Sequence, residues 1–373
     1  MNLLSIPTPR VVVDLNRVRR NIARMADRAA GAGVRLRPHT KTHKSPAIAK
    51  WQLDAGAVGV CCAKVGEAEV FAAAGIPDIL LPYPVLPSGI DRVLALLDRT
   101  RLSIIVDDLE VARGWSRALA SAGRQLDVLV KIDVGFHRCG MDPDRPDIVD
   151  SIQHIAGLPG ISFRGLLSYA GQSAAAGSVE ELHAIAQHEL AIVTRLAGDL
   201  RTRGVAIDEI SVGGTAMSRF IGDQPGVTEM RPGNYIFYDR MQVGLGSCTL
   251  DDCALSVIST VVSRPAPDRL VFDAGSKTLT SDGARGFAAM PGHGLVFPKL
   301  DDPTPDPAIV IERLSEEHGV ASVPNSCTLR PGDRVRILPN HSCVVTNMVD
   351  ELLVVDGMKI VDRLPVEARG MIW

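Results

Sequence analysis

The feature that most restricts the fold of this sequence is a regular alternation of short apolar, β-branched runs with stretches of helical periodicity. In the helical stretch 17–30, Val18, Ile22 and Met25 fall on one face, and the longest helix is expected near residues 180–203. The eight runs that predict strands are residues 34–40, 59–64, 78–84, 101–107, 127–134, 161–170, 209–214 and 227–235. Such an alternation predicts a parallel sheet with helices packed against it.

Eight strand–helix repeats within about 230 residues match the usual size of a (β/α)8 barrel of the TIM type. We therefore expect residues 14–246 to form an α/β domain of this kind. The parallel strands of such a barrel all end at one face, and the active site is built from the loops at that face. Polar residues that follow directly after the eight runs are therefore the candidates for function.

A second, mainly-β domain is expected from residues 247–373, because the helical periodicity fades there and Pro and Gly turns separate alternating runs. These strand-like runs are residues 255–264, 269–272, 333–338 and 351–355. The early run 10–15 also has strand character, but no helix precedes it. We expect it to pair with the C-terminal sheet, so that residues 1–13 belong to the β domain.

The composition restricts the possible functions. Hydrophobic residues make up 46% of the chain and charged residues 22%, and no stretch reaches the roughly 20 apolar residues that cross a bilayer. The first residues lack the pattern of a secretory signal, so a cytoplasmic protein is expected. Seven cysteines without framework spacing favour reduced thiols. A net charge of -3 gives no general reason to bind nucleic acid or membranes, which leaves a small-molecule substrate.

A lysine-containing motif, Arg37-Pro38-His39-Thr40-Lys41-Thr42-His43-Lys44, begins within the first predicted strand and continues past its end. Its position puts Lys41 at the mouth of the barrel, where a lysine amine can form an imine with a carbonyl compound. An isolated basic strand end is more often a solvated loop, because lysine is normally exposed. The residues at the other strand ends bear on which interpretation holds.

Several other strand ends carry groups that suit a phosphorylated aromatic cofactor. Arg138 follows the fifth strand between two glycines, and Tyr169 follows the sixth. The seventh strand ends in Gly213-Gly214-Thr215, where small residues let backbone N–H groups approach an anion, and the eighth ends in Arg231-Pro232-Gly233-Asn234-Tyr235. A Gly-Gly-Thr sequence alone is usually a simple turn. Together with the late barrel loops that often hold phosphate, these residues favour a cofactor site.

A candidate metal site lies near the C-terminus, in Pro339-Asn340-His341-Ser342-Cys343. A spacing of two residues would place His341 and Cys343 on the same side of an extended chain. Imidazole and thiolate together suit Zn²⁺, and two protein ligands would leave positions open for substrate and water. The alternative is a buried cysteine that acts as a small hydrophobic residue beside a hydrogen-bonded histidine.

These motifs resemble the D-threonine aldolase and D-serine dehydratase group of fold-type III pyridoxal-phosphate enzymes, which is related to alanine racemase. The likeness extends from Thr8-Pro9 to His341-Ser342-Cys343, and the motif around Lys41 looks like the cofactor-linking motif of the group. Residues 59–69, 127–140 and 266–277 look most like the aldolase branch, whereas residues 229–239 and 245–248 look more like the dehydratase branch.

The resemblance implies an alanine-racemase-like barrel with a β domain, usually as a homodimer, and it implies roles for the candidate residues. Lys41 would hold pyridoxal 5'-phosphate as a Schiff base. The other implied cofactor contacts are Arg138 beside the phenolic oxygen, Tyr169 at the ring, Arg231 at the pyridine nitrogen, and Gly214, Thr215, Gly233 and Asn234 around the phosphate. His341 and Cys343 would hold a divalent metal, zinc or manganese.

The implied function is a lyase that acts on β-hydroxy-D-amino acids, with Lys41, His43 or a metal-bound water as the base. Aldol cleavage to glycine and an aldehyde is the first expectation, because more of the chain resembles the aldolase branch. Aldolases of the group carry His-x-Asp at the metal pair, whereas the cysteine found here is the dehydratase form. Cys343 therefore favours the alternative, elimination by a D-serine or 3-hydroxyaspartate dehydratase. An amino-acid racemase is less favoured, as is a non-catalytic cofactor-binding barrel, which would lack the β domain.

Overall fold

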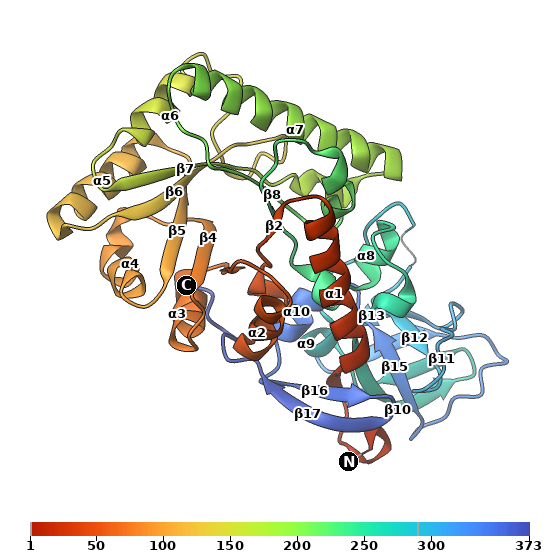
Figure 1. Cartoon of the computed structure of the whole chain (residues 1–373). Coiled ribbons are helices and arrows are strands. Elements are labelled where there is room, and N and C mark those ends of the chain that lie inside the picture. The colour runs from red at the N-terminus through yellow and green to blue at the C-terminus, as the bar shows by residue number, and fades with distance from the viewer. Residues whose placement is uncertain (1, 289–290) are drawn as a thin grey trace.

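The computed structural model describes residues 2–288 and 291–373 and contains two sheets, each the centre of one domain (Figure 1). The first sheet is parallel and has eight strands in the order β2-β9-β8-β7-β6-β5-β4-β3. Its strands are β2 (Arg35–Leu36), β3 (Val60–Cys61), β4 (Asp78–Pro84), β5 (Arg101–Val106), β6 (Leu126–Lys131), β7 (Ile161–Leu167), β8 (Glu209–Gly213) and β9 (Glu229–Arg231). Each falls within one of the eight predicted runs except β6, which begins one residue before the run 127–134.

The backbone between the first and last members of this order closes the sheet into a barrel. Val58 donates its N–H to the carbonyl of Leu36 at 2.9 Å, and Cys61 donates to the carbonyl of Pro38 at 2.7 Å. A parallel bridge joins His39 to Cys61 at the same place. The segment that carries Lys41 is therefore tied to the barrel wall on both sides, by β9 and by β3.

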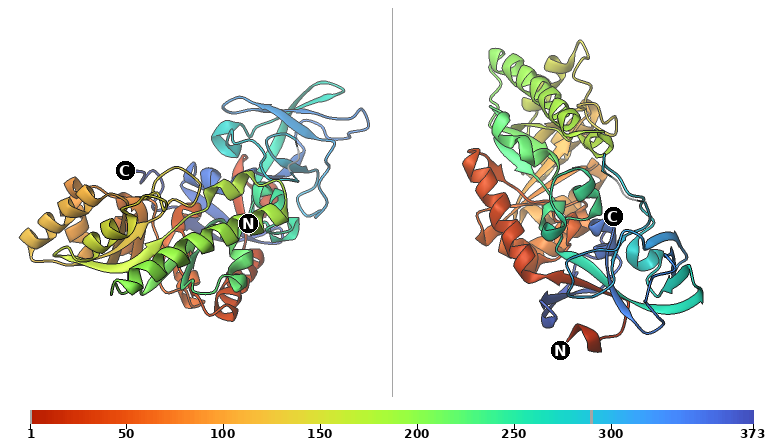
Figure 2. Two further views of the ribbon diagram at one scale, coloured as in Figure 1. Left: turned by 90° about the horizontal axis from the view of Figure 1, so that it is seen from above. Right: turned by 90° about the vertical axis from the view of Figure 1, so that its right-hand side faces the viewer.

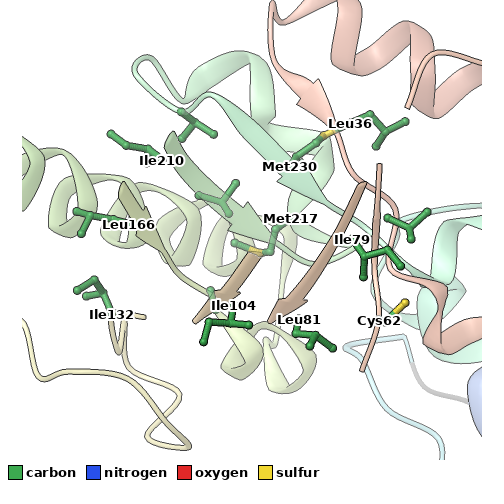
Figure 3. Packing of buried hydrophobic residues seen from close by; sticks show 14 of the residues in the cluster. Leu36, Cys62, Ile79, Leu81, Ile104, Ile132, Leu166, Ile210, Met217 and Met230 are labelled. Carbon is green, nitrogen blue, oxygen red and sulfur yellow. The ribbon is translucent and has the colours of Figure 1, made fainter. Parts of the chain in front are cut away.

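The barrel strands alternate between an inner and an outer packing layer, as strands with a two-residue period must. Cys61, Leu80, Ile105, Leu129 and Leu167 form one buried cluster, with one residue from each of β3 to β7. The neighbouring positions pack against the helices, and Figure 3 shows a part of this larger cluster. Its labelled members are Leu36, Cys62, Ile79, Leu81, Ile104, Ile132, Leu166, Ile210, Met217 and Met230. Both sides of the strands are apolar, which explains the continuous hydrophobic runs in the sequence.

Helices connect the barrel strands and cover the outer layer (Figures 1 and 2). They are α1 (Leu15–Gly31), α2 (Pro46–Asp54), α3 (Val65–Ala73), α4 (Ile90–Leu97), α5 (Leu109–Ala122), α6 (Ile148–Ala156), α7 (Val179–Thr202) and α8 (Arg240–Gly244). Asp14 caps α1 by accepting the N–H of Arg17 at 2.9 Å, and it is also the last residue of β1 (Arg10–Asp14). The chain thus passes from the second sheet into the barrel without a loop.

The second sheet has nine strands and includes the N-terminal strand, as predicted. β1 pairs antiparallel with β10 (Leu255–Ala266) and parallel with β16 (Glu351–Asp356). The remaining strands are β11 (Arg269–Phe272), β12 (Leu295–Phe297), β13 (Val310–Leu314), β14 (Gly319–Ser322), β15 (Arg334–Leu338) and β17 (Lys359–Pro365). Sequence analysis missed β12, β13, β14 and β17, because the first is very short and the others alternate with exposed or charged positions.

Two short helices, α9 (Ser276–Leu279) and α10 (Ser342–Asn347), interrupt the β domain and were not expected from its sequence. The C-terminal residues leave the sheet and return to the barrel, where the carbonyl of Trp373 accepts the N–H of Gly66 at 3.0 Å. No helix among the described residues is both long and apolar enough to span a membrane. The predicted fold class is confirmed, whereas the boundary between 14–246 and 247–373 stays a prediction.

Candidate active site

A cavity of about 410 Å³ opens where the barrel strands end and the β domain begins. It is large enough for a small-molecule cofactor and a substrate. Ten predicted residues line it: Lys41, Arg138, Tyr169, Gly214, Thr215, Arg231, Gly233, Asn234, His341 and Cys343. The structure therefore brings together residues from both domains that lie up to 302 positions apart, and only His43 of the predicted set is absent from the lining.

Lys41 belongs to a single 3-10 turn, Thr40–Thr42, that follows β2. The Thr40 hydroxyl anchors this turn, because it is buried and donates to the Glu67 carboxylate at 2.5 Å. The side chain of Lys41 is exposed and lines the cavity. Its backbone N–H points to the His39 ring nitrogen Nδ1 at 3.4 Å. A fixed turn thus presents a free amine to the cavity.

His43 lies on the other side of the same turn and is fully buried. Its Nδ1 accepts the backbone N–H of Ser45 at 3.1 Å, and its ring packs edge-on against Phe71. Burial lowers the pKa of His43 to about 3, so the ring is neutral. His43 therefore lies apart from Lys41, because residues two positions apart in a 3-10 turn do not face the same way, and its role as a catalytic base stays a prediction.

A candidate anion cradle lines the same cavity as Lys41, in the loops after β8 and β9. The backbone N–H groups of Gly214, Thr215 and Ala216 find no hydrogen-bond acceptor within residues 2–288 and 291–373. Gly214 has a φ of 109°, a conformation that favours glycine. A Cβ atom at Gly233 would lie only 3.1 Å from the Cβ and the carbonyl oxygen of His39. Unpaired, converging N–H groups of this kind bind phosphate.

Arg231 lines the cavity, and its two terminal guanidinium nitrogens are hydrogen-bonded to barrel atoms. Its guanidinium donates to the Ser211 hydroxyl at 2.5 Å and to the Ser168 carbonyl at 2.6 Å. The Ser211 hydroxyl in turn donates to Glu229 at 2.6 Å, and Glu229 also accepts from Arg37 at 2.8 Å. This buried network fixes the guanidinium of Arg231 and leaves it little freedom to move toward substrate.

Two further side chains form the wall that follows β6 and β7. Tyr169 presents its ring to the cavity, and the Arg138 guanidinium lies 5.1 Å from the centre of that ring. Phe136 packs edge-on against Tyr169, with 5.8 Å between ring centres. An aromatic ring beside a cation, in one cavity with an anion cradle, suits a planar, phosphorylated cofactor.

Sequence analysis missed Lys131, the last residue of β6, which is buried at the cavity wall. Burial lowers its pKa to about 7, and the neighbouring charge of Arg231 acts in the same direction. A lysine at the end of the apolar run 128–130 was the available signal. An amine with such a pKa can exchange a proton near neutral pH.

His341 and Cys343 face the cavity from the β domain, but not because the chain is extended there. His341 is the N-terminal cap of α10, and Cys343 lies in the first turn of that helix. The Cys343 sulfur is 3.2 Å from the Thr42 hydroxyl and 3.7 Å from the Asn234 side-chain nitrogen. The two candidate ligands therefore meet beside the turn of Lys41 and the anion cradle.

The two side chains form an ion pair of imidazolium and thiolate, and a metal would bind the thiolate and displace the imidazole proton. Burial opposes the charged form of each group, yet their mutual contact outweighs it, raising the pKa of His341 to about 10 and lowering that of Cys343. The thiolate is the form of cysteine that binds metals. Within the described residues there is no group of three or more His, Cys, Asp or Glu side chains that could hold a metal. A metal here would keep open positions for substrate and water.

Asp282 was also missed, since no local pattern links it to a histidine 59 residues later. Its Oδ2 lies 2.6 Å from Nδ1 of His341. A carboxylate in this place fixes the tautomer and orientation of the imidazole, and leaves Nε2 as the nitrogen for a metal. The same loop contributes Arg285 to the cavity lining.

The barrel, the lysine after its first strand and the adjoining β domain define an enzyme of the alanine racemase type. The model of the alanine racemase N-terminal domain matches residues 13–241, and that of a putative serine dehydratase domain matches residues 254–355. The chain belongs to the D-threonine aldolase and D-serine dehydratase family of these enzymes.

Two relatives cover almost the whole chain. The D-threo-3-hydroxyaspartate dehydratase of Delftia sp. (strain HT23) is 36% identical over 353 residues, which are 91% of this chain and 92% of the relative. The D-threonine aldolase of Arthrobacter sp. is 34% identical over 375 residues, 99% of this chain and 94% of the relative.

Solved structures of the dehydratase include two alanine variants, of a histidine and of a cysteine two positions later, and the cysteine variant is described as metal-free. The metal-free structure has a TM-score of 0.91 and 32% identity, with 98% of each chain covered. The predictions of family, fold and lyase class are confirmed.

Proposed function

We propose that this chain is a lyase that depends on pyridoxal phosphate and a divalent metal and eliminates the β-hydroxyl group of β-hydroxy-D-amino acids. The observation that carries the proposal is the position of His341 and Cys343 at the edge of the cavity that contains Lys41. A cofactor site and a metal site that share one cavity can act on neighbouring atoms of one small substrate.

The residues of the cavity fit the cofactor. Lys41 would bind it covalently through Nζ, and the unpaired N–H groups of Gly214 and Thr215, with Gly233 and Asn234 beside them, would hold its phosphate. When bound, this cofactor supplies a conjugated ring that withdraws electrons from Cα of the substrate. Arg231 would face the pyridine nitrogen, Arg138 the phenolic oxygen and Tyr169 the ring.

Proton transfer at Cα is assigned to the amine of Lys41. It is exposed to the cavity, whereas His43 is buried away from it. His39 also lines the cavity, but burial and the neighbouring charge of Lys41 lower its pKa well below the usual value, so its ring is neutral. The pair His341 and Cys343 would hold zinc or manganese, which supplies a Lewis acid for the substrate hydroxyl. Thiolate and imidazole together favour zinc.

Cys343 favours elimination over aldol cleavage. The structures of the similar dehydratase single out a histidine and a cysteine two positions apart, and one of these variants is described as metal-free. His341 and Cys343 have that spacing. Elimination would release water and, after hydrolysis, a 2-keto acid and ammonia.

Aldol cleavage to glycine and an aldehyde is the second candidate. It is supported by the likeness to D-threonine aldolase over 99% of this chain. The same cavity would bind the same substrate class, and the outcome would depend on whether the proton leaves Cα or the β-hydroxyl group.

The test is a product analysis with D-serine, D-threonine and D-threo-3-hydroxyaspartate, with and without EDTA. We expect a keto acid and ammonia, loss of turnover on chelation, and recovery with Zn²⁺ or Mn²⁺. Glycine with an aldehyde would replace the first candidate by the second. Conversion of a D-amino acid to its enantiomer, unaffected by EDTA, would show a racemase and overturn both. The variant His341→Ala should lose activity and bound metal while it keeps the absorbance of the cofactor.

We further propose a cytoplasmic homodimer. The large apolar side chains of Tyr83 in β4, and of Leu86 and Phe136 in the loops that follow β4 and β6, are exposed. Phe136 also packs on Tyr169, which lines the cavity, so a subunit placed there would close the site to water. Light scattering should give about twice the mass of 39.9 kDa expected for one chain, and Leu86→Glu should reduce it to one chain.

A further inference from the structure

Arg285 lines the cavity, and neither the cofactor roles nor the metal pair explain its charge. It lies between α9 and β12, and its side chain is exposed toward the cavity. No carboxylate among the described residues forms an ion pair with it. A guanidinium left free in a substrate cavity is suited to bind a carboxylate from outside the protein.

The backbone around Arg285 is held firmly at both ends. On one side, the carbonyl of Asp282 accepts the side-chain N–H of Asn340 at 2.9 Å, in addition to the contact with His341. On the other side, Ala288 donates to the carbonyl of Gly244 at 3.0 Å. Between them, a Cβ atom at Gly286 would lie 2.4 Å from the carbonyl carbon of Gly244. The segment thus bridges the metal pair and the barrel, with Arg285 at its centre.

The other arginines of the cavity are engaged on the cofactor side. Arg231 is hydrogen-bonded to Ser211 and Ser168 of the barrel. Arg138 lies against the ring of Tyr169. Arg285 instead follows Asp282 by three residues, and Asp282 contacts the metal ligand His341. Arg285 therefore belongs to the side of the cavity where the substrate hydroxyl would reach the metal.

The hydroxyl is carried by Cβ of the substrate, so a second substituent on Cβ would lie near it and near Arg285. We propose that Arg285 is a specificity-determining residue and that the chain prefers β-hydroxy-D-amino acids with a side-chain carboxylate. The inference rests on the proposed function, whose metal site places Cβ. The preferred substrate would then be of the 3-hydroxyaspartate class rather than serine or threonine.

The test uses two ligands that lack a β-hydroxyl group and so undergo neither elimination nor aldol cleavage. D-Aspartate carries the side-chain carboxylate and D-alanine does not, while both keep the amine and the α-carboxylate. Binding to the cofactor-loaded protein is measured by calorimetry for the wild type, Arg285→Gln and Arg285→Lys. Arg313→Gln is the matched control, because Arg313 is exposed on β13 and does not line the cavity.

We expect the wild type to bind D-aspartate about 10- to 100-fold more tightly than D-alanine, as a charge-assisted pair allows. Arg285→Gln should remove this preference without changing the affinity for D-alanine, Arg285→Lys should keep part of it, and Arg313→Gln should keep all of it. If Arg285→Gln lost affinity for both ligands equally, Arg285 would bind the α-carboxylate. If the variant lost affinity for neither ligand, Arg285 would bind neither carboxylate. Either result overturns the proposal, and so does a wild type that binds the two ligands equally well.

Failure of the proposed function would look different. In that case no β-hydroxy-D-amino acid is turned over with metal present, whatever the variants do to D-aspartate binding. If the function holds, kcat/KM for D-threo-3-hydroxyaspartate should fall in Arg285→Gln by the same factor as the D-aspartate affinity. The kcat/KM for D-serine should stay unchanged.

Discussion

At the scale of single residues, Lys41 gives the most direct prediction. It is exposed to the cavity that the candidate anion cradle also lines, so it is the residue expected to bind the cofactor covalently. The purified protein should be yellow, and borohydride should fix the cofactor to the peptide that contains Lys41, as mass spectrometry can show. Lys41→Ala should lose both the visible band and the labelled peptide. A colourless wild type that is fully active would contradict the assignment.

Substitution of His43 is expected to have little effect on activity, unlike substitution of Lys41. His43 lies in the same motif but outside the cavity. His43→Gln should keep most of the activity, whereas a catalytic base would lose orders of magnitude.

The folded protein holds His43 neutral, with a pKa of about 3 against 6.5 for an exposed histidine. The unfolded chain therefore binds the extra proton first, and stability falls as the pH drops from 6.5 toward 3. His43→Gln should flatten this part of an acid-unfolding curve followed by tryptophan fluorescence. An unchanged slope would contradict the buried, neutral state.

Residues near the strand ends could be predicted from the sequence because a barrel brings those ends together whatever the details of its loops. Lys41, Arg138 and Gly214 line the cavity for this reason. Asp282 and Arg285 could not be predicted, since they lie in an irregular segment of another domain whose path depends on packing against Asn340 and Gly244. The burial of His43 could not be predicted either, because the sequence does not show that residues 40–42 form a 3-10 turn, which directs Lys41 and His43 to different sides.

At the scale of elements, the contact between β7 and β8 depends on a glycine. Gly165 has a φ of 146°, and a Cβ atom there would lie 1.9 Å from the carbonyl oxygen of Glu209. Gly165→Ala should therefore reduce the free energy of unfolding by roughly 2–5 kcal/mol, from backbone strain and overpacking together.

Gly198→Ala serves as the control. Gly198 lies in α7, and nothing is within 4 Å of a Cβ atom added there. Alanine should stabilise that helix by about 0.5–1 kcal/mol. Urea unfolding measures the free energy of unfolding of both variants. If Gly165→Ala changed it no differently from Gly198→Ala, the strands β7 and β8 would have relaxed around the added methyl group.

The helical and strand periodicity predicted the barrel strands better than the β domain. Both faces of the barrel strands are buried, so their sequences are apolar throughout. In β17, by contrast, most side chains are exposed and charged residues interrupt the pattern. The helix α10 has only six residues, which is too short for a helical periodicity to be recognised in the sequence. Its position depends on Ser342, whose backbone N–H donates to the Asp239 carboxylate of the barrel at 2.9 Å.

At the scale of the whole molecule, the N-terminal strand joins the two domains more closely than a linker would. β1 lies between β10 and β16 in the middle of the second sheet and continues directly into α1 of the barrel. The position of His341 and Cys343 relative to Lys41 is therefore set by packed elements, and not by a flexible connection. For this reason the sequence could predict that residues from both domains meet in one cavity.

The contact of Cys343 with Thr42 and Asn234 has a thermodynamic consequence. The sulfur touches the turn of Lys41 and the phosphate cradle at 3.2 and 3.7 Å, so each ligand of the cavity orders groups that the other needs. Binding free energies are reciprocal: the factor by which metal tightens cofactor binding equals the factor by which cofactor tightens metal binding. We expect both factors to exceed one when measured by equilibrium dialysis, and Thr42→Val to bring them closer to one. Cofactor and metal would then bind this enzyme cooperatively in the cell. A shortage of either one would lower the occupancy of both sites.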